Sequence, residues 1–153
     1  MKKEKNLMND LFGYTPEQFS ASRIATQYGI NNTIPDKWLP NLAHFNNIMF
    51  KRTIDYNLYL ISGYRSEVLN KYFDGNYRRR HDMCLSADFL ASKENIQKLL
   101  LNIKEEHFLR VFEYRPLHQI VHISIYSESQ SFIIGKSERF PLFINLNELF
   151  IEI

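Results

Sequence analysis

The chain has 153 residues, of which 44% are hydrophobic and 14% aromatic, so it can bury enough apolar surface to exclude a disordered polypeptide. One folded domain over residues 1–153 is expected. Lys and Arg number 19 and Asp and Glu 17, a formal charge of +2 that gives no reason to expect a nucleic-acid partner. The single cysteine, Cys84, excludes an intramolecular disulfide and any site built from several thiolates, so a metal would be held by histidines and carboxylates.

Helical patterns occur mainly in the first two thirds of the sequence. Residues 1–18 form a poorly defined N-terminal segment, with a short helix expected around 15–19. From residue 35, apolar side chains recur every three or four positions, which predicts an amphipathic helix over 35–52. Two further helices are expected, one over 66–73 and one that begins after the capping residue Ser92.

Strand patterns dominate the second half. They predict strands at 58–61, 86–91, 109–114, 119–126 and 131–134, the last three joined by connections short enough for antiparallel neighbours. The C-terminal tail, 140–153, is apolar and ambiguous. Helices that precede and interrupt a strand-rich half predict an α+β fold, with a small antiparallel sheet and flanking helices.

The sequence shows no signal peptide and no membrane-spanning segment. Its charged N-terminus is followed by no apolar run of the length that export requires, and no stretch reaches the roughly 20 apolar residues of a transmembrane helix. We expect a monomer in the cytoplasm, without membrane insertion.

Alternation along two predicted strands turns polar side chains away from the core. His122 projects from the more polar face of 119–126, and Asp88 projects from 86–91 on the side opposite its apolar residues. An ionised carboxylate on a half-buried strand is costly unless it is solvated, paired or bound to a cation. His81 lies seven positions before Asp88, in a loop that can fold back toward it.

His81, Asp88 and His122 therefore suggest a metal centre. Three imidazole and carboxylate ligands with an open fourth position are typical of catalytic zinc. The residues alone leave other interpretations open: a loop histidine, an Asp that caps local N–H groups, and a surface His122.

Three motifs surround these residues. They are a Ser-Gly-Tyr-Arg turn at 62–65 followed by Leu-Asn at 69–70, the step from His81 to Asp88, and a Val-His strand at 121–122. In order and spacing they resemble the zinc D-alanyl-D-alanine carboxypeptidase and L-alanyl-D-glutamate peptidase family, most closely its short phage and bacterial members that act on peptidoglycan. The resemblance spans roughly residues 19–126.

The resemblance implies a hedgehog/DD-peptidase-like fold and a Zn²⁺ ion held by His81, Asp88 and His122. It makes Arg65 the cation that meets the substrate's carboxylate or polarises its scissile carbonyl, and it implies that Tyr64 and Ser62 of the same turn contribute to substrate binding. A guanidinium suits two oxygens because it is planar and permanently charged.

From the residues alone, a surface salt bridge between Arg65 and Glu67 or Asp74 is the other interpretation.

The chain departs from the family pattern close to the proposed ligands. Arg79 stands where the family has Ser, Cys84 where it has Gly, and Ile120 where it has Trp. Gln119 occupies the position of the usual general base, and its amide cannot accept a proton. Glu113, at the end of the preceding strand, is the nearest acidic candidate for that role; a solvated strand-end Glu is the other interpretation.

Two functions are expected from these features. One is zinc-dependent hydrolysis of peptidoglycan stem peptides, by a DD-carboxypeptidase or an endolysin-like endopeptidase that is cytoplasmic or phage-associated. The alternative is a catalytically impaired, metal-binding module of the same fold that recognises the cell wall or has a structural role.

Overall fold

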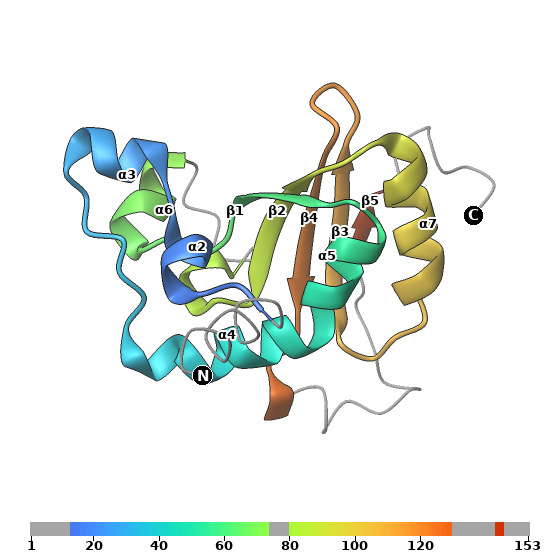
Figure 1. The fold of residues 1–153 in the computed structure, drawn as a ribbon, viewed down its shortest axis with the longest axis horizontal. Coiled ribbons are helices and arrows are strands. Elements are labelled where there is room, and N and C mark those ends of the chain that lie inside the picture. Colours follow the sequence, from blue (N-terminus) through green and yellow to red (C-terminus); the bar gives the residue numbers. More distant parts are fainter. Residues whose placement is uncertain (1–12, 74–79, 130–142, 146–153) are drawn as a thin grey trace, which may run out of the picture.

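A five-stranded sheet organises the computed structural model, which describes residues 13–73, 80–129 and 143–145 (Figure 1). Its strand order is β1-β2-β4-β3-β5. The first four strands pair antiparallel, and β5 pairs parallel with β3. The strands are β1 (Tyr59–Ser62), β2 (Ser86–Leu90), β3 (Leu109–Arg115), β4 (Ile120–Ile125) and β5 (Phe143–Asn145).

Helices connect and flank this sheet. Before β1 the chain forms α2 (Pro16–Ser20), α3 (Arg23–Tyr28) and a run made of η1 (Asp36–Trp38), α4 (Leu39–Phe45), η2 (Asn46–Phe50) and α5 (Lys51–Asp55). Between β1 and β2 lie α6 (Glu67–Phe73) and η4 (His81–Met83), and α7 (Lys93–Ile103) connects β2 to β3. None of the described helices combines the length and apolarity needed to cross a membrane.

Local sequence signals predicted most of these elements. The helix expected over 35–52 is confirmed and continues to Asp55. Capping works as the sequence indicates, because the Ser92 hydroxyl accepts a hydrogen bond from the backbone N–H of Asn95 at 3.2 Å. α3 has no counterpart among the predicted helices, although Ser22 caps its start and Gly29 ends it.

The predicted strands that pair in the sheet are confirmed, and they give the α+β class. β5 lies within the tail that the sequence left ambiguous, and its parallel pairing means that the described sheet is not wholly antiparallel. The strand expected at 131–134 lies outside the described residues.

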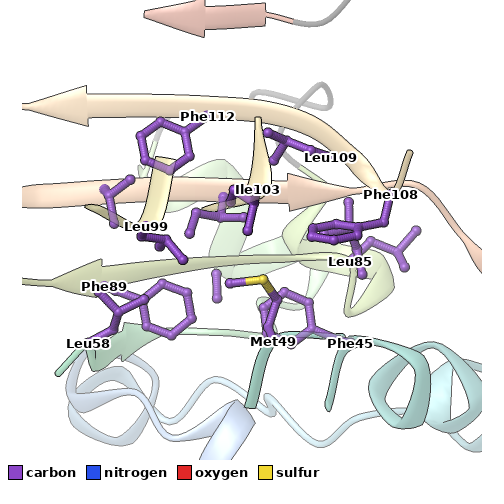
Figure 2. Close-up of a cluster of buried hydrophobic side chains, with 14 of the residues drawn as sticks. Phe45, Met49, Leu58, Leu85, Phe89, Leu99, Ile103, Phe108, Leu109 and Phe112 are labelled. Carbon is purple, nitrogen blue, oxygen red and sulfur yellow. The ribbon is translucent and has the colours of Figure 1, made fainter. Parts of the chain in front are cut away.

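One face of the sheet carries the hydrophobic core (Figure 2). Alternate residues of the central strands point into it, and α7 and the α4–η2 run supply the opposing side chains. Burying each Leu, Ile or Phe stabilises the fold by roughly 1.5–3 kcal/mol relative to leaving it exposed. The buried set includes Phe45, Met49, Phe89, Leu99, Ile103, Phe112, Val121 and Ile123.

Candidate metal centre

The register of the sheet aligns four polar residues in one row on its other face. Asp88 of β2 stands opposite His122 of β4, and His122 stands opposite Glu113 of β3. On the other side of β2, Ser62 pairs with Asp88 next to an irregularity in β1. Directly opposed residues point to the same face, with Cβ atoms about 4.5–5.5 Å apart. We call Ser62, Asp88, His122 and Glu113 the site row.

His81 reaches this row from outside the sheet. It lies in the one-turn helix η4, which is flanked by Arg80 and Cys84 in the left-handed conformation, with φ of 56° and 59°. These two residues turn the chain sharply before β2 begins. The His81 side chain is fully buried, and its Nδ1–H donates to the Gly63 carbonyl oxygen at 2.7 Å.

That hydrogen bond defines the chemistry of the His81 ring. With the proton on Nδ1, the lone pair is on Nε2, which is the arrangement of a metal-ligating histidine held by a carbonyl. Nε2 is buried and has no hydrogen-bond partner among the described residues. It lies 3.6 Å from Oδ2 of Asp88. A buried acceptor without a partner is costly, so a cation at this position would remove an unfavourable feature.

The three predicted ligands come together in the structure. One ligand atom from each of His81, Asp88 and His122 lies within 4.8 Å of the other two. Nδ1 of His122 is 2.7 Å from Oδ1 of Asp88, and the two imidazole rings are 5.0 Å apart between centroids. Zinc binds nitrogen and oxygen at about 2.0–2.2 Å, so donors at these separations can converge on one ion. The residues fit a metal ion.

Asp88 is ionised in this setting. Its burial would raise the pKa of the carboxyl, but hydrogen bonds from His122 and from His81 when its Nε2 carries a proton, together with the charges of the protonated rings, outweigh burial and lower the pKa well below its ordinary value of 3.8. A carboxylate held charged is the form that binds a cation, because metal ligands must be deprotonated.

Arg65 makes an ion pair with this same carboxylate. Its Nη2 lies 2.8 Å from Oδ2 of Asp88, and its Nε donates to the hydroxyl of Ser62 at 3.0 Å. Arg65 is only 7% exposed, so the pair is weakly screened by solvent. The salt bridge from Arg65 to Glu67, which sequence left open, is not the one observed: Glu67 pairs with Lys71 at 3.6 Å. Asp74 lies outside the described residues.

Tyr64 lies in the hydrophobic core, whereas Ser62 lies beside Arg65. Tyr64 is 5% exposed and packs in the hydrophobic cluster, and burial raises the pKa of its hydroxyl, as Cys84 and Asp82 also do to a smaller extent. Ser62 is partly exposed at the end of β1 and orients Arg65.

Asn32 supports the site, although it was not among the residues predicted for it. Its side-chain amide donates to the carbonyls of Ser20 and Tyr64 at 2.8 and 3.0 Å. Its Oδ1 accepts from the N–H of Ser66 at 2.7 Å. The amide therefore holds the turn that carries both Arg65 and the carbonyl that orients His81. No spacing or composition signal distinguishes this asparagine from its neighbour.

Glu113 stands beside His122 but outside the group of three ligands. Its carboxylate is 3.6 Å from Nε of Arg115, and its side chain is 17% exposed. Gln119 lies exposed in the β3–β4 turn with φ of 53°. His118 lies in the same turn. Apart from the proposed ligand Asp88, Glu113 is the acidic residue of the site row.

Cys84 is a buried thiol. Burial, with a smaller contribution from Asp82, raises the pKa of Cys84 to about 12, so the thiol is protonated at neutral pH and is neither a nucleophile nor a ready metal ligand. Its left-handed φ accounts for the glycine that the resembling family has at this position. Arg79 lies outside the described residues.

Comparisons with known proteins add no family assignment. No family model matches the chain, and no curated protein or solved structure matches it significantly. What the site can do is therefore inferred from its geometry and from the three motifs.

Proposed function

We propose that this chain is a zinc-dependent peptidase of the hedgehog/DD-peptidase fold that hydrolyses peptidoglycan stem peptides. The observation that carries the proposal is the convergence of His81, Asp88 and His122 from three separate segments onto one buried point. Arg65 lies at the same point, in contact with Asp88. The Ser-Gly-Tyr-Arg and Val-His motifs around these residues support the choice of reaction.

The ligand set suits zinc. Two imidazoles and one carboxylate leave a fourth position for water or substrate, which is the catalytic arrangement. When bound, Zn²⁺ lowers the pKa of a coordinated water toward about 7 and polarises a carbonyl oxygen.

The protein's own groups would divide the remaining work. The Gly63 carbonyl keeps the Nε2 lone pair of His81 directed at the ion. Arg65, held by Ser62, presents a fixed positive charge beside Asp88, where it would bind a substrate carboxylate or the developing charge on the scissile carbonyl. Glu113, opposite His122, would accept and return a proton.

A metal-binding module without catalysis is the second candidate. It is favoured by Gln119, because the usual base is replaced by an amide that lies exposed in a turn. It is favoured also by the ion pair of Glu113 with Arg115, which engages the remaining acidic candidate. Such a protein would bind zinc and cell-wall peptide without producing cleavage products.

The experiment that tests the proposal is metal analysis joined to a cleavage assay. Purified wild-type protein, His81→Ala, His122→Ala and the control His118→Ala are loaded with zinc, dialysed and analysed for bound metal. Wild type and His118→Ala are expected to retain about one zinc per chain, and the two ligand variants to lose it. Each sample is then incubated with peptidoglycan, and soluble products are separated by mass.

Release of D-Ala or split cross-links by wild type and His118→Ala alone would support the peptidase. Zinc retention with co-sedimentation on peptidoglycan but no products would favour the binding module. Equal zinc content in all four proteins would remove the basis of both.

A further inference from the structure

A second row of side chains crosses the sheet next to the site row, on the same face. Two residues beyond Asp88 along β2, Leu90 pairs with Tyr59 of β1 and with Ile120 of β4, and Ile120 pairs with Arg115 of β3. Side chains two positions apart on a strand share a face and lie roughly 6.6 Å apart. We call Tyr59, Leu90, Ile120 and Arg115 the outer row.

The outer row is exposed to solvent, whereas the residues on the opposite side of Asp88 are buried. Tyr59 is 72% and Leu90 43% exposed. On the opposite side of Asp88, Ser86 and Ser124 form the next rung and are both 0% exposed. The site can therefore be approached from the side of the outer row.

The outer row is mainly apolar, although Tyr59 and Leu90 are exposed. Three of its four side chains are apolar or aromatic, and they form one line across β1, β2 and β4. The fourth, Arg115, has a side chain that is 44% exposed. Its ion pair with Glu113 uses Nε, and a guanidinium carries five N–H donors, so it can bind a further carboxylate.

We propose that the outer row is the subsite that holds the substrate peptide beside the metal, and that it selects a peptide with small apolar residues and one free carboxylate within the chain, such as the α-carboxylate of a γ-linked Glu. This inference rests on the proposed function. Tyr59, Leu90 and Ile120 would cover alanyl methyl groups, and Arg115 would pair with the acidic residue. Four strands spaced about 4.8 Å apart span roughly 14 Å, which is the length of about four extended residues.

Kinetics with a soluble stem peptide tests the apolar part. The peptide contains L-Ala, γ-linked D-Glu, L-Lys and terminal D-Ala-D-Ala. Zinc-loaded wild type is compared with Leu90→Asn and with Leu101→Asn, a matched control on α7 at a leucine that is 53% exposed. Leu90→Asn should raise KM roughly tenfold with kcat and zinc content unchanged, and Leu101→Asn should change none of them.

A second peptide, in which the D-Glu carboxyl is amidated, tests the charged part. Wild type should prefer the acidic peptide roughly tenfold in kcat/KM, and Arg115→Ala should lose this preference. The ratio is used because Arg115→Ala also changes the surroundings of Glu113, and that effect cancels between the two peptides. Arg23→Ala, at an exposed arginine on α3, should keep the preference.

Binding of both peptides to the zinc-loaded proteins is measured from changes in NMR chemical shifts. These binding data separate this inference from the proposed function. Cleavage by wild type with unchanged KM in Leu90→Asn and no preference to lose in Arg115→Ala would overturn the subsite and leave the peptidase standing. Binding without cleavage, weakened by both variants, would keep the subsite and overturn the peptidase. Absence of both binding and cleavage would overturn both.

Self-association would also overturn the subsite. If sedimentation shows a dimer that Leu90→Asn dissociates, the outer row is a contact between two copies of the chain.

Discussion

Gly63 lies where the backbone allows no side chain, and the substitution Gly63→Ala is expected to disturb the metal centre through the peptide unit that orients His81. A Cβ on Gly63 would lie 2.5 Å from the carbonyl oxygen of Phe19 and 2.7 Å from two atoms of its ring. Ordinary contact begins near 3.4 Å, so the Gly63 segment or Phe19 must move by about 0.9 Å. Phe19 and Gly63 are both buried, and the Tyr64 N–H donates to the Phe19 carbonyl oxygen at 2.8 Å, so relief of the clash requires the Gly63 segment to shift against Phe19.

The expected magnitude follows from two contributions. Forcing one extra methyl group into a packed site destabilises a protein by about 1–3 kcal/mol. The hydrogen bond from Nδ1 of His81 to the Gly63 carbonyl is 2.7 Å long, so a displacement of that size away from the ring breaks it. Loss of such a partner typically lowers metal affinity 10- to 100-fold, or about 1.4–2.7 kcal/mol of binding free energy.

The assay measures stability and zinc affinity separately. Urea unfolding in the presence of a chelator gives the free energy of unfolding, and competition with a chromophoric chelator gives the zinc Kd. Gly29→Ala is the control, because Gly29 has a left-handed φ of 64° but nothing within 4 Å of an added Cβ. It should cost about 1 kcal/mol of stability through backbone strain and leave the zinc Kd unchanged. Wild-type zinc affinity in Gly63→Ala would refute the role given to this carbonyl.

Three further measurements follow from the same contacts. Asn32→Ala should lower the free energy of unfolding by about 2–4 kcal/mol in urea titrations, because three backbone groups lose their partner, whereas Asn31→Ala at the exposed neighbour should change it by less than about 0.5 kcal/mol. The thiol of Cys84 should resist labelling in the folded protein at pH 8 and react in denaturant. Because its pKa of about 12 in the folded state exceeds the value near 9 in the unfolded chain, its contribution to stability is intact below pH 9 and falls by about 1.4 kcal/mol per unit from pH 9 to 12. That slope should be absent from Cys84→Ala, and an equal slope in both proteins would contradict the assignment. Zinc at 100 times its Kd should stabilise wild type by about 2.7 kcal/mol, a gain that EDTA removes and that His122→Ala never shows in thermal unfolding.

Local patterns were sufficient for much of the site. Period-two alternation put Asp88 and His122 on the polar faces of their strands, and both residues point to the same face in the structure. The seven-residue step from His81 allowed a folded-back loop, and η4 supplies it. These inferences succeeded because side-chain direction along a strand depends on the strand alone.

Contacts between distant segments could not be read in the same way. The sequence offered Glu67, a near neighbour in the chain, as a partner for Arg65, yet the arginine pairs with Asp88 and Glu67 pairs with Lys71. Tyr64 was expected at the substrate, and its ring lies in the core cluster. A side chain with several candidate partners pairs according to distance and burial, and both depend on how the whole chain packs.

The sequence alone determined most of the helices and strands, the polar and apolar faces of β2 and β4, and three residues suited to a metal. Tertiary structure decides the rest: that β4 lies between β2 and β3, that Asp88, His122 and Glu113 fall in one row, and that Gly63 must lack a side chain. The physical reason is the distance along the sequence over which each interaction acts. Helix capping and strand alternation act over a few residues, whereas register and close approach arise only when segments far apart in the sequence pack into one core.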